Sequence, residues 1–367
     1  MNKNEVIAVL LSTVFFIIGL LTLPHYGINW DTVNHLPRGQ AYLHFFLTGK
    51  GDYSDLPAYV AYWQKPESLA INPDITKEKF PRRSFYQSDA TTFNWFMVND
   101  GGHPPLSDIL ASVFNYIFFQ QIGLVNDIDA YGIYGIFLAA CLVGLIFWWT
   151  AKIYGKFSGF IAALSLALYP LFWSEAHFNT QKDIPETVYW SFLLFSVWYG
   201  ITQKNHKWIL AAGIFLGLAL GTKFNVLFIP LVIIPWLVVF LINQYLNKRP
   251  RSKQRFSIKE FVLKNRKFSL SILSSPFIGV VIFIGSWPYL WSDLIGNLGG
   301  IFKFYEEIGF TTNINTNHSR DYCFNGGRMR EIKFRAWGEE SKKWFYYDEI
   351  QGRSDIYPDQ KCSQSFQ

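Results

Sequence analysis

The amino-acid sequence predicts an all-α polytopic membrane protein, a bundle of about seven membrane-spanning helices. Half of the 367 residues are hydrophobic and only 16% are charged, whereas about a quarter of the residues in an ordinary soluble domain carry charge. The hydrophobic residues are also gathered in runs close to the length of about 20 residues that a helix needs to cross a bilayer. Much of this chain is therefore expected to lie away from water.

The first apolar run covers residues 6–23. It follows a single basic residue, Lys3, and has no small-residue cleavage site, which favours a retained membrane anchor over a removable signal peptide. Six further runs predict the remaining spans, with bounds good to a few residues, at 131–150, 157–173, 187–201, 208–220, 225–242 and 268–289.

Basic residues orient these predicted spans. The formal net charge is +6, and nine of the Lys and Arg residues fall within residues 248–267. Short cytoplasmic loops collect Lys and Arg, so we interpret this loop as a topology signal and not as a nucleic-acid-binding surface. Counting back one span at a time places the other short basic loops on the same, cytoplasmic side, with lysines at 152, 156, 204 and 207.

The run 104–122 is ambiguous by hydropathy, and topology decides it. With Lys3 inside, the first span delivers the chain to the outer side, where run 131–150 must also begin, so no further span fits between them. Polar residues interrupt the run, which suits a helix in the outer membrane interface. The sequence therefore predicts a first outer loop, residues 24–129, that bears interfacial helices.

Four ionisable residues are then predicted to share the outer face, namely Asp31, His103, Asp183 and Lys223. They are far apart in sequence, but each lies at or just beyond the outer end of a span or of the interfacial helix. Ionisable side chains at a membrane are costly and tend to mark functional sites. This grouping predicts a site at the membrane surface.

Asp31 and His103 each allow a chemical and a structural interpretation. A partly desolvated carboxylate just after the first span is a stronger base, as deprotonation of a hydroxyl nucleophile requires; alternatively, Asp31 caps the following helix. His103 opens the tetrad HPPL (103–106) at the start of a helix, where it could donate to a lipid phosphate. The alternative is a solvated loop histidine.

Asp183 and Lys223 likewise each allow a chemical and a structural interpretation. Asp183 lies in the polar turn QKDIP (181–185), as a helix cap or as a functional acid. Lys223 ends a helix, where a cation can reach any lipid headgroup or bind the phosphate of a particular lipid. The preceding glycines recur every four residues on one helix face, which predicts close helix packing, at Gly213, Gly217 and Gly221.

Taken in order, these elements resemble the N-terminal part of a GT-C glycosyltransferase of the protein O-mannosyltransferase and aminoarabinose-transferase branch. The resemblance covers residues 1 to about 327. Members often carry two adjacent acids where this chain has Asp31-Thr32. The matching pattern is Trp30-Asp31, the tetrad HPPL (103–106), Asp183-Ile184-Pro185, Thr222-Lys223 and the aromatic exit WPYLW (287–291).

The resemblance implies an inverting transfer of a sugar from a polyprenyl-phosphate-linked donor to an acceptor hydroxyl outside the cytoplasm. It implies that Asp31 is the general base and that His103 and Lys223 hold the leaving phosphate, with Arg38 as a third candidate. Asp183 would position the acceptor or support the structure.

The expected partners follow from the same resemblance. They are the lipid-linked donor, membrane lipids and a protein or glycan acceptor, without nucleic acid. No cofactor is assigned, and a role for a divalent metal is left open. The expected location is the bacterial plasma membrane, with a cytoplasmic N-terminus and an active face outside.

The tail, residues 328–367, differs from the rest. The segment MREIKFRAW (329–337) and the charged, aromatic residues after it resemble the start of a YopX-like phage protein, over about 329–350. We expect a short α/β-type or disordered soluble tail joined to a truncated transferase, which puts activity in doubt. The alternative functions are a flippase or transporter for lipid-linked sugars and a phage-associated membrane protein defined by its tail.

Overall fold

The computed structural model describes residues 3–29, 31–59, 82–100, 102–247, 266–314, 335–338 and 343–346. The chain divides into two compact units, Met1–Ile314 and Asn315–Gln367. The predicted boundary at residue 327 lies outside the described residues. Each unit is described separately.

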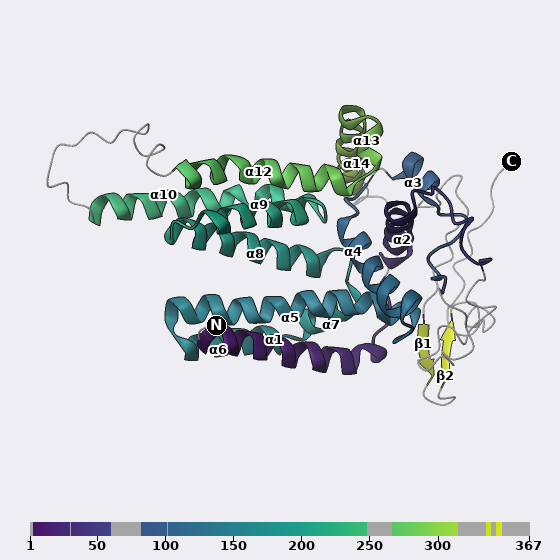
Figure 1. The fold of residues 1–367 in the computed structure, drawn as a ribbon, viewed down its shortest axis with the longest axis horizontal. Coiled ribbons are helices and arrows are strands. Elements are labelled where there is room, and N and C mark those ends of the chain that lie inside the picture. The colour runs from purple at the N-terminus through teal and green to yellow at the C-terminus, as the bar shows by residue number, and fades with distance from the viewer. Residues whose placement is uncertain are drawn as a thin grey trace. The chain divides into compact units, whose positions relative to one another are not determined.

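Long helices of the first unit lie side by side and form a bundle (Figure 1). The most extensive contacts join α9 to α12, α8 to α9, α1 to α5, and α5 to α6. The helices of the bundle are α1 (Lys3–Thr22), α5 (Asp127–Tyr154), α6 (Lys156–Ala167), α7 (Pro170–Phe178), α8 (Asp183–Thr202), α9 (His206–Leu220), α10 (Pro230–Asn247) and α12 (Arg266–Ser286).

The described residues contain four helices that are long and apolar enough to cross a membrane, and α6 with α7 make a fifth if that pair, bent by 59°, is one span. The prediction of an all-α polytopic membrane protein is confirmed, but this count is below seven. The predicted runs 187–201 and 208–220 are helical as α8 and α9. Acidic residues in the first turn make α8 less apolar, and α9 has only 15 residues.

Two predicted spans are interrupted at proline. In run 157–173 the residue before Pro170 is extended, as proline requires of its predecessor, and α7 begins at that proline. Run 225–242 begins as a 3-10 helix, η5 (Phe224–Phe228), and becomes α-helical only from Pro230. Proline suits the first turn of a helix because it has no N–H to leave unpaired.

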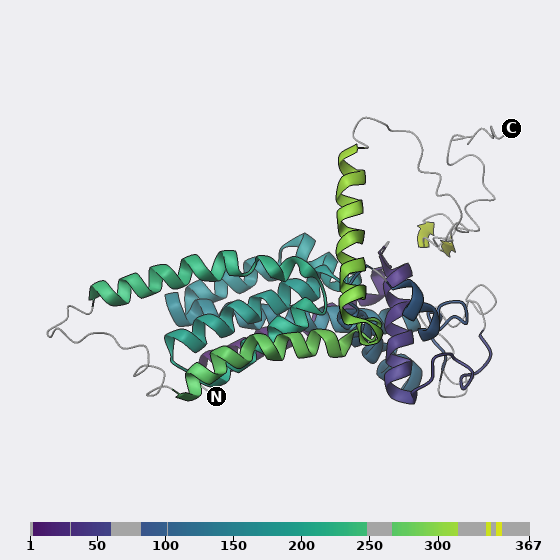
Figure 2. The ribbon, with the colours of Figure 1, turned by 90° about the horizontal axis from the view of Figure 1, so that it is seen from above.

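Helices of the predicted first outer loop lie at one end of the bundle (Figures 1 and 2). They are α2 (Thr32–Thr48), α3 (Phe93–Asn99) and α4 (Leu106–Asn115), and α4 continues as a π-helix, η4 (Tyr116–Gln121). α2 packs on α4, and α4 packs on α5. Neither α4 nor η4 is among the helices that could span a membrane, in agreement with the sequence.

The polar residues of run 104–122 have a different role from the predicted one. Asp108, Asn115 and Gln120 are all buried, whereas an interfacial helix would expose such residues. Asn115 donates to the carboxylate of Asp127 at the start of α5, over 2.7 Å, and Ser84 donates to the same carboxylate over 2.8 Å. These polar groups hold the outer-loop helices to the bundle, because a buried polar group needs a partner.

The predicted packing role of the spaced glycines is confirmed. A Cβ atom on Gly213 would lie 2.4 Å from the carbonyl oxygen of Ser275, and one on Gly217 would lie 2.6 Å from the side chain of Ile282, both on α12. A Cβ on Gly221 would lie 2.8 Å from Leu106. Small residues thus allow α9 to approach α12 and the start of α4.

Two helices follow the bundle, α13 (Tyr289–Ser292) and α14 (Leu294–Ile314), and the sequence did not predict α14. Seen from above, α14 crosses the direction of the bundle (Figure 2). In the second unit, β1 (Arg335–Gly338) and β2 (Lys343–Tyr346) pair antiparallel with Arg335 opposite Tyr346. The rest of the predicted tail, including residues 329–334, lies outside the described residues.

Candidate functional site

The turn between α7 and α8 forms two adjacent ion pairs. The Nζ atom of Lys182 lies 3.2 Å from Oδ1 of Asp31, and that of Lys223 lies 2.9 Å from Oδ1 of Asp183. Lys182 and Asp183 are consecutive residues. Their ion pairs therefore link Asp31, which follows α1, to Lys223, which follows α9. Three of the four predicted site residues are therefore together, as predicted, and Lys182 joins them.

Asp31 does not cap α2 with its side chain. It occupies the N-cap position, but its carboxylate makes no capping hydrogen bond. The amide oxygen of Asn29 takes that role, accepting from the backbone N–H and the hydroxyl of Thr32 over 3.0 and 2.6 Å. The side chain of Asp31 is 42% exposed beside Lys182. A carboxylate placed in this way can accept a proton from an approaching ligand.

Asp183 is held by two donors. Besides Lys223, the amide of Asn179 donates to its Oδ2 over 2.8 Å. Partial burial opposes ionisation of this carboxyl, but the hydrogen bonds from Lys223 and Asn179 lower its pKa below the usual value. Asp183 is therefore an ionised anchor for Lys223.

Arg38 does not face the site as a free cation. Its side chain is buried and donates to Asp100 over 2.8 Å, to Asp108 over 2.5 Å and to the backbone oxygen of His103 over 2.5 Å. Burial opposes its charge, but Asp100 and Asp108 raise the pKa of Arg38 above the ordinary value. The predicted contact of Arg38 with a phosphate is thus replaced by contacts that hold residue 103.

Asp100 is the centre of this buried network. Its carboxylate accepts from Arg38, from the hydroxyl of Tyr42 over 2.5 Å and from the indole of Trp287 over 2.9 Å. These donors come from α2 and from the residue that follows α12, so one buried carboxylate joins two distant segments. Hydrogen bonds to charged groups are the strong ones in proteins. This set holds Arg38, which in turn donates to the backbone oxygen of His103.

Asp108 completes the network from the first turn of α4. Oδ2 of Asp108 lies 3.0 Å from Nδ1 of His35. Burial alone would raise the pKa of Asp108, but His35 and Arg38 together lower it below the usual value. His35 and Arg38 lie three residues apart on one face of α2, but their spacing does not tell which acids they meet.

His103 is a neutral imidazole in this setting. Burial, followed by the charge of Lys182, lowers the pKa of His103 to about 3. Its Nδ1 lies 2.6 Å from the hydroxyl of Tyr305 on α14. The expected contact of His103 with the leaving phosphate is therefore limited to a hydrogen bond, because a ring without charge cannot neutralise an anion.

The tetrad 103–106 docks on the segment that carries Lys223. The backbone N–H of Leu106 donates to the carbonyl of Gly221 over 2.8 Å, and the hydroxyls of Ser107 and Thr222 lie 2.7 Å apart. Two motifs separated by more than a hundred residues thus meet directly. This docking brings the start of α4 beside the turn from α9 to η5.

Glu186 is a buried acid that the sequence did not single out. It lies one residue before the predicted span 187–201 and is 7% exposed. Its Oε1 accepts from the indole of Trp190 over 2.6 Å, while its buried Oε2 has no hydrogen-bond partner among the described residues. Burial raises the pKa of Glu186 to about 8, so it is largely neutral at pH 7.

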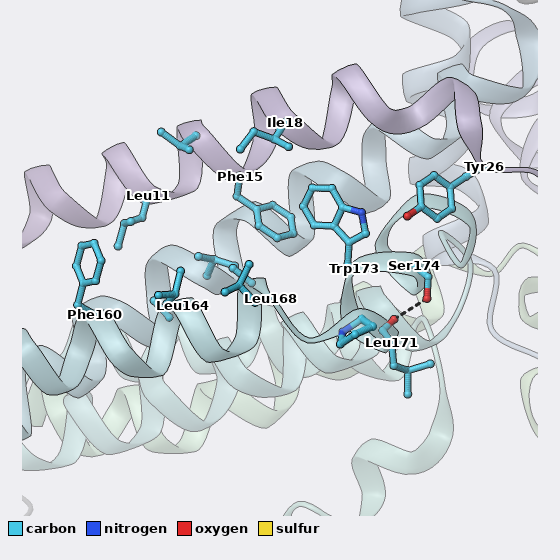
Figure 3. Close-up of a pocket in the computed structure, with 15 residues that line it drawn as sticks. Leu11, Phe15, Ile18, Tyr26, Phe160, Leu164, Leu168, Leu171, Trp173 and Ser174 are labelled. Atoms are coloured by element: carbon cyan, nitrogen blue, oxygen red, sulfur yellow. Dashed lines mark hydrogen bonds between the residues drawn. The ribbon is translucent and has the colours of Figure 1, made fainter.

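An apolar pocket of about 900 Å³ lies between α1, α6 and α7. Figure 3 shows Phe15 and Ile18 of α1 facing Leu164 and Leu168 across it, with Tyr26 at one end. The ring of Tyr26 stacks on His177 at a centroid distance of 4.0 Å. The pocket lining is almost entirely hydrocarbon and aromatic, which suits an apolar ligand.

The described residues contain no group of three or more His, Cys, Asp or Glu side chains that could hold a metal ion. The acids of the site are instead paired with lysines, arginine or hydrogen-bond donors. The geometry therefore assigns no metal ligands.

Comparison with known proteins gives one family match. Residues 102–256 match the family described as dolichyl-phosphate-mannose-protein mannosyltransferase. The matched segment includes His103, Asp183 and Lys223 but not Asp31, and it covers less than half of the chain. No curated protein and no solved structure gives a significant match. None of these comparisons supports the resemblance of the tail to a YopX-like protein.

The apolar helices support an integral membrane protein. The family match supports a glycosyltransferase that is similar to mannosyltransferases. The match also suggests a lipid-linked sugar donor.

Proposed function

We propose that this protein transfers a sugar from a polyprenyl-phosphate-linked donor to an acceptor hydroxyl at the outer face of the membrane. The observation that carries the proposal is the placement of Asp31. Its carboxylate is partly exposed at the end of an apolar bundle, beside Lys182, in a chain whose residues 102–256 match a mannosyltransferase family.

The reaction uses Asp31 as the general base. Asp31 takes the proton of the acceptor hydroxyl while that oxygen forms a bond to the anomeric carbon of the donor sugar. The bond from this carbon to the phosphate oxygen breaks on the opposite face, and the phosphate leaves with the bonding electrons. The products are the inverted glycoside, the polyprenyl phosphate and a protonated Asp31. A positioned base of this kind contributes about 10²- to 10⁴-fold to a rate.

The leaving phosphate gains a negative charge in this step, and Lys223 is placed to offset it. Its side chain is 30% exposed and is held by Asp183. Preorganised charge of this kind stabilises a transition state without reorganisation at the moment of reaction. His103, as a neutral ring, supplies a hydrogen bond to the phosphate.

The apolar pocket supports a donor with a long hydrocarbon chain. Its lining residues Leu164, Leu168 and Leu171 are themselves partly exposed, so the pocket opens toward the surroundings of the helices. Lipid tails are as apolar as this lining, so van der Waals packing, and not removal from water, holds a hydrocarbon chain in such a pocket. A polyprenyl chain suits a pocket of this kind.

The test is sugar transfer by the purified full chain in lipid nanodiscs. Polyprenyl-phosphate-mannose serves as donor, with a serine/threonine peptide or a glycan as acceptor. We expect Asp31→Asn to lower kcat by about 10²-fold or more. Asp52→Asn is the matched control, because Asp52 is a fully exposed acid beyond α2. Wild-type turnover in Asp31→Asn would remove the base assignment, and absence of transfer by the wild type with sugar donors of this class would overturn the proposal.

A further inference from the structure

The two ion pairs of the site differ in how firmly they are held. Lys223 donates a hydrogen bond to Asp183, which also accepts from Asn179. Lys182 lies 3.2 Å from Asp31, and the described residues offer the Asp31 side chain no second donor comparable to Asn179. The Lys182–Asp31 pair is therefore the one that a competing anion can open.

Resting on the proposed function, we propose that Lys182 exchanges Asp31 for the phosphate of the polyprenyl-phosphate lipid. In the free protein Lys182 holds the base. When the lipid phosphate binds, Lys182 moves to the phosphate and leaves the carboxylate of Asp31 without its cation. The base is thus released at the moment when a donor is in place.

The position of Lys182 suits this exchange. Its backbone is fixed at the start of α8, where its carbonyl accepts from the N–H of Glu186 over 3.0 Å. Its side chain is 16% exposed and reaches toward Asp31, which is 42% exposed. The ammonium lies on a flexible four-carbon stem, so its charged end can change partners while its backbone stays in place.

Lys182 also lies on the side of the site where the phosphate is expected. Its charge is, after burial, the largest cause of the lowered pKa of His103, so its ammonium lies near that ring as well as near Asp31. A cation that acts on both the base and His103 can serve either. The four charges of the paired residues cancel, and an added phosphate would leave one anion in excess, which favours release of the least firmly held acid.

The exchange predicts in which direction the affinity for phosphate changes when Asp31 is replaced. If Asp31 and phosphate compete for Lys182, removal of the carboxylate frees the lysine and tightens phosphate binding. Partly exposed ion pairs contribute about 0.2–1 kcal/mol, which corresponds to a binding change of about 1.5- to 5-fold. A residue that only supported the structure would produce no such tightening.

The experiment measures binding of a polyprenyl monophosphate to the purified full chain in nanodiscs. We expect Asp31→Asn to bind about 1.5- to 5-fold tighter than wild type, Lys182→Gln to bind more weakly, and Lys182→Arg to recover most of the affinity. In the Lys182→Gln background, Asp31→Asn should no longer tighten binding. The uncharged polyprenol should respond to none of these changes, because it lacks the phosphate.

Asp52→Asn controls for the change in net charge, and Lys50→Met controls for loss of an exposed lysine near Asp55. Equal tightening by Asp31→Asn with and without Lys182 would overturn the exchange, as would unchanged or weaker binding in Asp31→Asn alone. Equal competition by phosphatidylglycerol would show that the site takes any lipid phosphate, and would overturn the donor assignment. The assay needs no turnover, so a chain that binds in this pattern but transfers no sugar would contradict the proposed function and leave the exchange standing.

Discussion

At the scale of single residues, the structure largely keeps the residues that the sequence proposed for the site, but it changes the charge or the burial expected for two of them. Asp31, Asp183 and Lys223 are together as the sequence predicted, but His103 is neutral and Arg38 is enclosed. The sequence shows which ionisable residues could meet. It does not show the neighbours that set their charge, because Asp100, Asp108 and Tyr305 reach the network from other parts of the chain.

The neutral state of His103 gives a prediction for pH dependence. Because the pKa of His103 is about 3, its charge does not change between pH 5 and 8. We expect His103→Gln to lower the rate of sugar transfer by a similar factor at every pH in this range. Parallel pH profiles for the two proteins would agree with this, whereas loss of an inflection near pH 6.5 in the variant would show that His103 titrates as an ordinary histidine.

Glu186 gives a prediction for stability. Burial raises its pKa from 4.5 to about 8, so between these values the unfolded chain has released a proton that the folded chain retains. The contribution of the neutral Glu186 to the free energy of unfolding is fully present below pH 4.5 and is lost as the pH rises through 8. Glu186→Gln keeps an acceptor for Trp190 and cannot ionise.

We therefore expect this variant to raise the unfolding temperature in detergent clearly at pH 8.5 and much less at pH 5. Glu306→Gln, at an exposed position of α14, is the control and should show no such pH dependence. A benefit of Glu186→Gln that is the same at both pH values would contradict the raised pKa.

At the scale of helices, hydropathy found the positions of all seven runs but not their continuity. Pro170 and Pro230 each begin a new helix, whereas Pro235 and Pro276 lie inside α10 and α12 without ending them. Proline weakens a helix when it lies beyond the first turn, and packing decides whether the helix breaks there. The π-helix after α4 and the helix α14 likewise depend on tertiary contacts, which no local pattern in the sequence reveals.

The contact between α2 and α4 depends on Gly39. A Cβ atom there would lie 2.2 Å from the backbone oxygen of Asp108 and 2.6 Å from the hydroxyl of Ser112. We expect Gly39→Ala to push the two helices apart and to lower the free energy of unfolding by about 1–3 kcal/mol. Transfer activity should fall as well, because Arg38 and Asp108 would separate.

Gly285→Ala is the matched control, since a Cβ at this position of α12 would meet nothing within 4 Å and alanine favours helix over glycine. Thermal unfolding of the three proteins in detergent measures the difference. Equal stability of Gly39→Ala and the wild type would show that α2 and α4 leave room for a methyl group at this position.

At the scale of the whole molecule, the helices agree with a membrane protein, and the side on which the site lies stays a prediction. The basic loops place residue 207 inside and residue 50 outside. The three native cysteines can be replaced by serine, and Lys50→Cys or Lys207→Cys introduced singly at exposed positions. We expect a membrane-impermeant maleimide to label only position 50 in intact cells and both positions after permeabilisation. Labelling of position 207 from outside would reverse the proposed orientation.

The contact between His103 and Tyr305 has a practical consequence for anyone shortening this protein. The hydroxyl that meets the histidine belongs to the last helix of the first unit. A fragment designed from the hydropathy plot alone would stop soon after residue 289. The imidazole of His103 would then lose its contact with Tyr305 and be open to solvent. The smallest piece worth assaying therefore has to retain α14 in full, to Ile314.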